Sequence, residues 1–193
     1  MSVSKGMVRL VVWGMLVWLS LPGSSYASDS LAWDALREGR ALLLLRHASA
    51  PGFSDPANFQ LDDCTTQRNL SSQGREESRR WGALLRSQRI EQPRLFSSRW
   101  CRARDTAREM DLGTVEPLPA LDSFFANRAR ASQQTAELVA QVNGLARGAP
   151  MVLVSHQVNI SALTGSYPAS GEGLILALPL GVPAQVLARI PAP

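Results

Sequence analysis

Two continuous apolar runs, Ala41 to Leu45 and Met151 to Val154, constrain the fold of this chain most strongly. A strand with one face in water alternates apolar and polar residues, whereas a strand buried on both faces is apolar throughout. Segments with a helical spacing of apolar residues lie before, between and after these runs. The pattern predicts an α/β fold, a three-layer α/β/α sandwich with a mostly parallel central sheet.

The same spacing predicts the remaining elements. We expect helices over residues 30–37, 72–90, 100–110 and 158–163, one more that Ser132 caps, and strands over residues 95–97, 174–178 and 186–190. Residues 111–131 are expected to be irregular. Residues 48–71 form a long polar loop, and loops of this length in compact domains are often functional.

The N-terminal segment has the pattern of a secretory signal peptide. Lys5 and Arg9 precede an apolar stretch from Leu10 to Leu21, and small residues lead to Ala27. A membrane anchor is the alternative, but a spanning helix needs about 20 apolar residues. We therefore expect residues 1–27 to be cleaved off, leaving a periplasmic domain over residues 28–193 without a stable membrane anchor. Cleavage would reduce the formal charge from +4 to +2 and weakens any case for a nucleic-acid partner.

The residues best suited to binding or catalysis lie directly after three of the expected strands. The only histidines, His47 and His156, each follow one of the two apolar runs, and Arg102 follows the strand at residues 95–97. Ligands of open α/β sheets bind at the carboxyl ends of the strands, so these side chains and Arg46 are expected to share one crevice. Guanidinium groups bind phosphate through charge-assisted hydrogen bonds. The alternative is that the two histidines are structural and that the arginines lie on a solvated helix face. We expect such a solvated position for Arg99.

Four sequence motifs, in this order, resemble the histidine phosphatase superfamily and its phosphoglycerate-mutase-like branch. The resemblance covers about residues 41–177 and rests on Arg46-His47-Ala48, on Asn69-Leu70-Ser71 with Gly74 and Glu77, on Arg102 with Ala103, Thr106 and Ala107, and on Ser155-His156. It implies a phosphoglycerate-mutase-like fold and a phosphatase that needs no metal and no cofactor.

The resemblance also implies roles for the site residues. His47 would be the nucleophile and form a phosphohistidine, while Arg46, Arg102 and His156 would bind the phosphate oxygens. The substrate would be a small-molecule or envelope-glycan phosphate ester, because the chain is similar to small exported members that include phosphatases of lipopolysaccharide-core heptose phosphates. The branch usually supplies a glutamate as general acid, and here Asp122 occupies that segment.

The identity of the general acid leaves alternatives open. Asp122 could be a turn or cap residue, in which case Glu172 is the next candidate. Without a competent acid, the chain could instead be a catalytically impaired module that binds phosphate or another anion on the same fold.

The chain contains two cysteines, Cys64 and Cys101. Their spacing shows no pattern of a metal site, and export would place them in an oxidising compartment. We expect a Cys64–Cys101 disulfide that ties the long loop to the helix carrying Arg102, with two free thiols as the alternative.

Overall fold

The computed structural model describes residues 24–193, which contain six strands in one sheet of order β3-β2-β4-β1-β5-β6. The strands are β1 (Ala41–Arg46), β2 (Arg94–Ser97), β3 (Val115–Pro117), β4 (Met151–Ser155), β5 (Gly173–Ala177) and β6 (Val186–Ile190). β1, β2, β3 and β4 pair in parallel, and only the pairs β1–β5 and β5–β6 are antiparallel. The mostly parallel sheet predicted from the sequence is confirmed.

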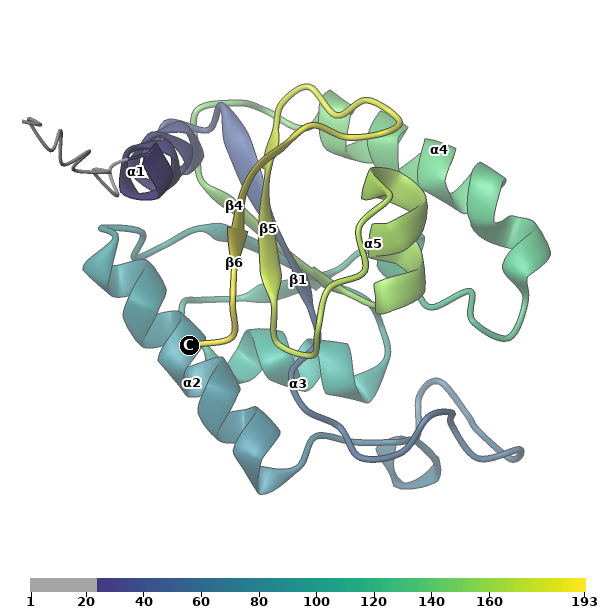
Figure 1. Cartoon of the computed structure of the whole chain (residues 1–193). Coiled ribbons are helices and arrows are strands. Elements are labelled where there is room, and N and C mark those ends of the chain that lie inside the picture. The colour runs from purple at the N-terminus through teal and green to yellow at the C-terminus, as the bar shows by residue number, and fades with distance from the viewer. Residues whose placement is uncertain (1–23) are drawn as a thin grey trace, which may run out of the picture.

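Five α-helices cover the two faces of this sheet: α1 (Ser24–Arg37), α2 (Ser72–Ser87), α3 (Cys101–Glu109), α4 (Ala131–Gly144) and α5 (Gln157–Thr164). One apolar cluster joins α1, α2 and α3 to one face, and a second joins α4 and α5 to the other. Figure 1 shows α1 and α2 on one side of the strands and α4 and α5 on the other. The expected three-layer sandwich is therefore present.

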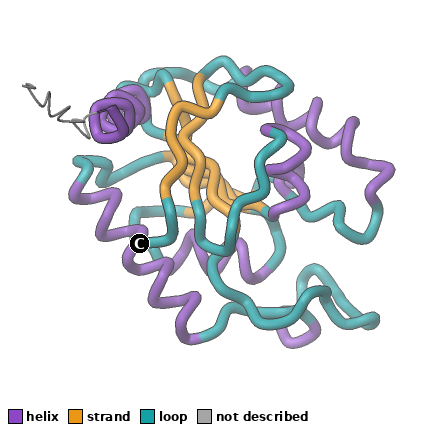
Figure 2. The backbone as a smooth tube through the Cα atoms, in the orientation of Figure 1, coloured by secondary structure: helices purple, strands orange, loops and turns teal. Residues whose placement is uncertain are grey.

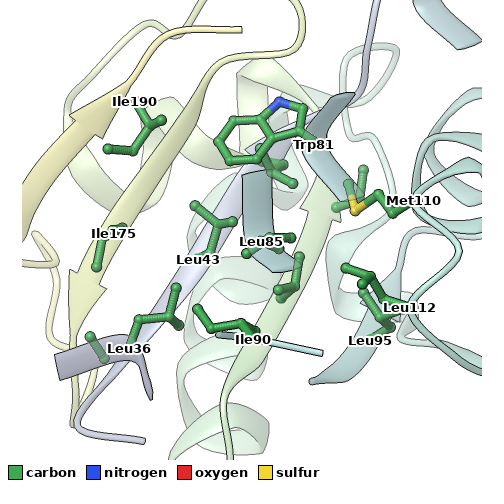
Figure 3. Close-up of a cluster of buried hydrophobic side chains, with 14 of the residues drawn as sticks. Leu36, Leu43, Trp81, Leu85, Ile90, Leu95, Met110, Leu112, Ile175 and Ile190 are labelled. Atoms are coloured by element: carbon green, nitrogen blue, oxygen red, sulfur yellow. The ribbon is translucent and has the colours of Figure 1, made fainter. Parts of the chain in front are cut away.

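β1 lies in the middle of the sheet because its side chains are apolar on both faces. Leu43 and Leu45 belong to the cluster under α2, whereas Leu42 and Leu44 belong to the cluster under α4 and α5. Trp81 of α2 is fully buried against the first cluster (Figure 3), and its indole N–H donates to the Gly171 carbonyl at 2.7 Å. Burial of apolar surface on both faces of the strand stabilises the folded state by about 25 cal/mol per Å².

Several element boundaries differ from the prediction. Residues 115–117 form the edge strand β3, which was not predicted. Its last residue, Pro117, fits this position because proline in sheets is confined to edge strands. Ser132 lies inside α4, whose N-cap is Arg130, so the predicted cap is wrong. α1 begins at Ser24 instead of Ser30, and α2 ends at Ser87 instead of residue 90.

The segments that leave the carboxyl ends of the parallel strands lie at one end of the sheet (Figure 2). They differ in length, because only His156 separates β4 from α5 whereas residues 47–71 separate β1 from α2. The loop of residues 48–71 contains only one short 3-10 helix, Cys64–Thr66. Most of the expected signal peptide, residues 1–23, lies outside the described residues. Within residues 24–193, no helix is long and apolar enough to cross a membrane.

Candidate active site

His47 and His156 follow β1 and β4, neighbouring parallel strands in which Arg46 pairs with Ser155. The matching strand ends bring the two imidazole rings to a centroid separation of 5.4 Å, and both rings are buried. The two histidines therefore meet at the carboxyl end of the sheet, where ligands of α/β folds bind.

Of the two arginines expected at the site, one contacts a histidine ring and the other lies close enough to act on it by its charge. Arg102, in the first turn of α3, donates from its guanidinium Nε to His47 Nε2 at 3.2 Å. Arg46 ends β1 and donates from Nη1 to the carbonyl oxygen of Pro168 at 2.9 Å. The positive charge of Arg46 contributes to lowering the pKa of His47. Three strand ends thus supply the four phosphate-site residues that the sequence singled out.

The contacts of His47 determine which ring nitrogen is reactive. Its Nδ1 lies 2.8 Å from the carbonyl oxygen of Ala48, which can only accept, so Nδ1 carries the proton. Nε2 then presents a lone pair, in agreement with the N–H that Arg102 donates to it. Burial, followed by the charge of Arg102, holds the pKa of His47 well below its usual range. The unprotonated Nε2 is therefore available as a nucleophile at neutral pH.

His156 is oriented by a chain of two polar side chains. Its Nε2 lies 2.8 Å from Ser98 Oγ, and this hydroxyl donates to Asp122 Oδ1 at 3.2 Å. Because the hydroxyl proton is used there, Ser98 Oγ accepts the proton of His156 Nε2. The buried Nδ1 of His156 has no hydrogen-bond partner within the described residues, and it is the atom that a bound ligand can engage.

Burial, followed by the charges of Arg102 and His47, holds the pKa of His156 well below its usual range. In the ligand-free protein this ring is therefore neutral. An anion beside the ring favours its charged form, in which Nδ1 would donate a hydrogen bond to the anion.

Arg68, in the loop of residues 48–71, is a third arginine of the site that the sequence analysis did not single out. Burial is the main cause of the lowered pKa values of Arg46, His47, Arg102 and His156, and the charge of Arg68 lowers them further. Burial lowers the pKa of Arg102 to about 10, although Asp55 raises it. The signal available in the sequence was position, since Arg68 directly precedes the Asn69-Leu70-Ser71 motif. Three partly buried guanidinium groups favour a multiply charged anion.

Asp122 lies next to this cluster but is engaged elsewhere. Its carboxylate accepts hydrogen bonds from the backbone N–H and from Nε of Arg99, both at 2.8 Å, and from the Ser98 hydroxyl. Arg99 is therefore paired and not simply a solvated side chain. Asp122 reaches His156 only through Ser98, which favours a positioning role over the predicted role as general acid.

Glu172 is also committed to structural contacts. Its carboxylate pairs with Arg189 and accepts the backbone N–H of Ala169. Although burial raises the pKa of Glu172, these contacts lower it overall. A carboxyl group with a lowered pKa is a poor proton donor at neutral pH. The contacts of Glu172 therefore disfavour its predicted role as the alternative general acid.

A disulfide joins Cys64 to Cys101, with the two Cα atoms 5.7 Å apart. This confirms the expected pairing and fixes the loop of residues 48–71 to the residue that precedes Arg102. Gln67 adds to the attachment, because its side-chain oxygen accepts the backbone N–H of Cys101 at 2.9 Å. No group of three or more histidine, cysteine, aspartate or glutamate residues within residues 24–193 is arranged to hold a metal ion.

Solved structures of phosphatases share this fold at low sequence identity. The protein histidine phosphatase SixA complexed with tungstate is 21% identical, with a TM-score of 0.55 over 79% of this chain and 97% of that chain. A mycobacterial glucosyl-3-phosphoglycerate phosphatase in complex with VO3 is 19% identical, with a TM-score of 0.54 over 76% and 98% of the two chains. Phosphoserine phosphatase from Entamoeba histolytica, in complex with 3-phosphoglyceric acid, is 11% identical, with a TM-score of 0.56 over 78% and 96%.

No protein-family model and no curated protein matches the chain in sequence. The structural similarity covers about four fifths of this chain and nearly all of each phosphatase. The chain therefore shares the fold of these phosphatases.

Proposed function

We propose that this chain is a phosphatase that hydrolyses phosphate monoesters through a phosphohistidine on His47. The observation that carries the proposal is the state of His47: its Nε2 is unprotonated, buried and 3.2 Å from Nε of Arg102. A nucleophile surrounded by guanidinium groups suits phosphoryl transfer, in which positioning and charge stabilisation do most of the catalysis. Structures with the same fold include complexes with tungstate and with VO3.

In the first step, Arg46, Arg102 and His156 hold the phosphate oxygens. His47 Nε2 attacks phosphorus, the N–P bond forms, and the bond to the ester oxygen breaks. Arg102 gives up its hydrogen bond to His47 Nε2 when the phosphate binds, and the guanidinium groups then stabilise the charge on the transferring group. The departing alkoxide takes a proton from a carboxyl group and leaves as an alcohol.

In the second step, water takes the place of the alcohol. The carboxylate that lost its proton removes one from the water, whose oxygen attacks phosphorus as the N–P bond breaks. Inorganic phosphate leaves and His47 returns to its starting state. Two moderate displacements thus replace one difficult displacement by water.

The proposed location is the periplasm, and the proposed substrate is an envelope sugar phosphate. The location rests on the secretory pattern of residues 1–27 and is supported by the Cys64–Cys101 disulfide, since disulfides persist in oxidising compartments. The substrate rests on the sequence motifs, which resemble those of small exported phosphatases. Neither depends on the chemistry proposed for His47.

The test is turnover of a panel of phosphate esters by the mature protein, including sugar phosphates, phosphopeptides and nitrophenyl phosphate. Arg102→Gln should reduce kcat/KM by at least about 100-fold, because it removes a charged donor to the transferring group. Arg108→Gln is the matched control, because Arg108 is exposed on the same helix. It should leave kcat/KM within about twofold.

The same experiment separates an enzyme from an anion-binding module. If the protein releases phosphate, and Arg102→Gln slows this release whereas Arg108→Gln does not, the result supports the phosphatase. Binding of inorganic phosphate without turnover of any ester would instead support the module. An Arg102→Gln protein that turns over as fast as the unmutated protein would refute the proposed site.

A further inference from the structure

Asp55, in the loop of residues 48–71, is held directly against the phosphate site. Its Oδ1 accepts hydrogen bonds from Nη1 of Arg102 at 2.8 Å and from the backbone N–H of Arg68 at 3.0 Å. Its Oδ2 accepts from Nε1 of Trp100 at 3.1 Å. The Asp55 side chain keeps 17% of its surface exposed, so the carboxylate is positioned but still accessible to a ligand.

One guanidinium group connects Asp55 to the proposed nucleophile. Arg102 donates to Asp55 through Nη1 and to His47 Nε2 through Nε, so the two residues lie on neighbouring edges of one planar group. A phosphoryl group that Arg102 holds and that His47 attacks would therefore lie beside the Asp55 carboxyl group. A proton donor must be within hydrogen-bond reach of the leaving oxygen, and this placement meets that requirement.

Aromatic rings also border Asp55. The Trp100 ring, which donates to Asp55, meets the His156 ring edge to face at 5.7 Å and stacks on Phe59 at 5.2 Å. Asp55 thus lies between the charged cluster and an aromatic wall. An ester whose phosphate occupied the cluster and whose alcohol part contacted these rings would have its bridging oxygen near Asp55.

No other carboxylate of the described residues forms an ion pair with Arg46, Arg68 or Arg102. Asp122 pairs with Arg99, and Glu172 pairs with Arg189. Asp55 is thus the carboxylate with the most direct route to the reacting atoms.

We propose that Asp55 is the general acid and base of this site, a role that rests on the phosphatase function proposed above. When a phosphate dianion binds Arg102, its negative charge beside Asp55 favours the protonated carboxyl. Asp55 gives this proton to the leaving oxygen as the P–O bond breaks and the bond between His47 Nε2 and phosphorus forms. The resulting carboxylate takes a proton from the attacking water as the N–P bond breaks, which restores the protonated acid.

The experiment compares two esters of similar shape, phenyl phosphate and 4-nitrophenyl phosphate. Nitrophenolate leaves without a proton, whereas phenolate is more basic and benefits from one. Asp55→Asn should lower kcat/KM about 100-fold for phenyl phosphate and less than about fivefold for 4-nitrophenyl phosphate.

Asp62→Asn is the matched control, since Asp62 is exposed in the same loop and loses the same charge. It should leave the ratio of the two kcat/KM values unchanged, and thermal unfolding of each variant checks that it folds. Asp122→Asn tests the rival acid. A changed ratio in Asp122→Asn with an unchanged ratio in Asp55→Asn would overturn the proposal in favour of Asp122.

An equal loss with both esters in Asp55→Asn would also overturn the proposal, because it would mean that Asp55 only positions Arg102. Failure of the underlying function looks different. In that case the unmutated protein turns over neither ester, and the proposed acid falls together with the phosphatase.

Discussion

Reduction of the Cys64–Cys101 disulfide should destabilise the protein strongly, because the bridge closes a long loop. The two cysteines are 37 residues apart, and chain entropy gives about 4 kcal/mol of stabilisation for a loop of this length. With a urea m-value of about 2 kcal/mol/M for a domain of this size, the unfolding midpoint should fall by about 2 M. Tryptophan fluorescence reports the transition, because Trp33 and Trp81 are buried in the folded protein.

The assay compares urea unfolding of the mature protein with and without a reductant. A double variant, Cys64→Ala with Cys101→Ala, is the control, since its midpoint should not respond to the reductant. Reduction should also lower kcat/KM, because the loop that it releases carries Asp55 and Arg68. Equal midpoints for the oxidised and reduced forms of the unmutated protein would refute the entropic argument.

Two further predictions concern packing and pH. A Cβ at Gly82 would lie 2.0 Å from the Met110 carbonyl oxygen, whereas one at Gly144 would meet nothing within 4 Å. Gly82→Ala should therefore lower the free energy of unfolding by at least about 2 kcal/mol, and Gly144→Ala should not lower it, as thermal unfolding will show. Because the pKa values of His47 and His156 are lowered in the folded protein, only the unfolded chain takes up their protons below pH about 6.5. Stability should fall as the pH drops below that value, by at most about 2.7 kcal/mol per pH unit from these two groups, and less steeply when both are replaced by asparagine.

Apolar patterning was sufficient to predict the layers of the fold. β1 and β4 were predicted nearly to the residue, because strands buried on both faces have no polar positions that blur the signal. The edge strand β3 was missed, since Val115-Glu116-Pro117 is too short for an apolar run or an alternation to stand out. Its position depends on pairing with β2, a tertiary contact that local spacing does not encode.

The site was predictable where it depends on strand ends and not where it depends on the loop. His47, His156 and Arg102 follow strands, so the rule for α/β sheets places them. Asp55 and Arg68 lie in an aperiodic loop whose path is fixed by the disulfide and by hydrogen bonds to distant residues. Sequence spacing carries no information on such a path, although Asp55 is the first acidic residue after His47.

Direct detection of the phosphorylated intermediate tests the central claim, that His47 is a nucleophile. The mature protein would be mixed with 4-nitrophenyl phosphate, quenched in base during turnover, and digested for mass spectrometry. We predict one phosphoryl group on the peptide with His47, stable in base and lost in acid, and none in His47→Ala, whose turnover should fall at least about 1000-fold. A His47→Ala protein that keeps near-normal turnover, or a phosphoryl group found on another residue, would contradict the account.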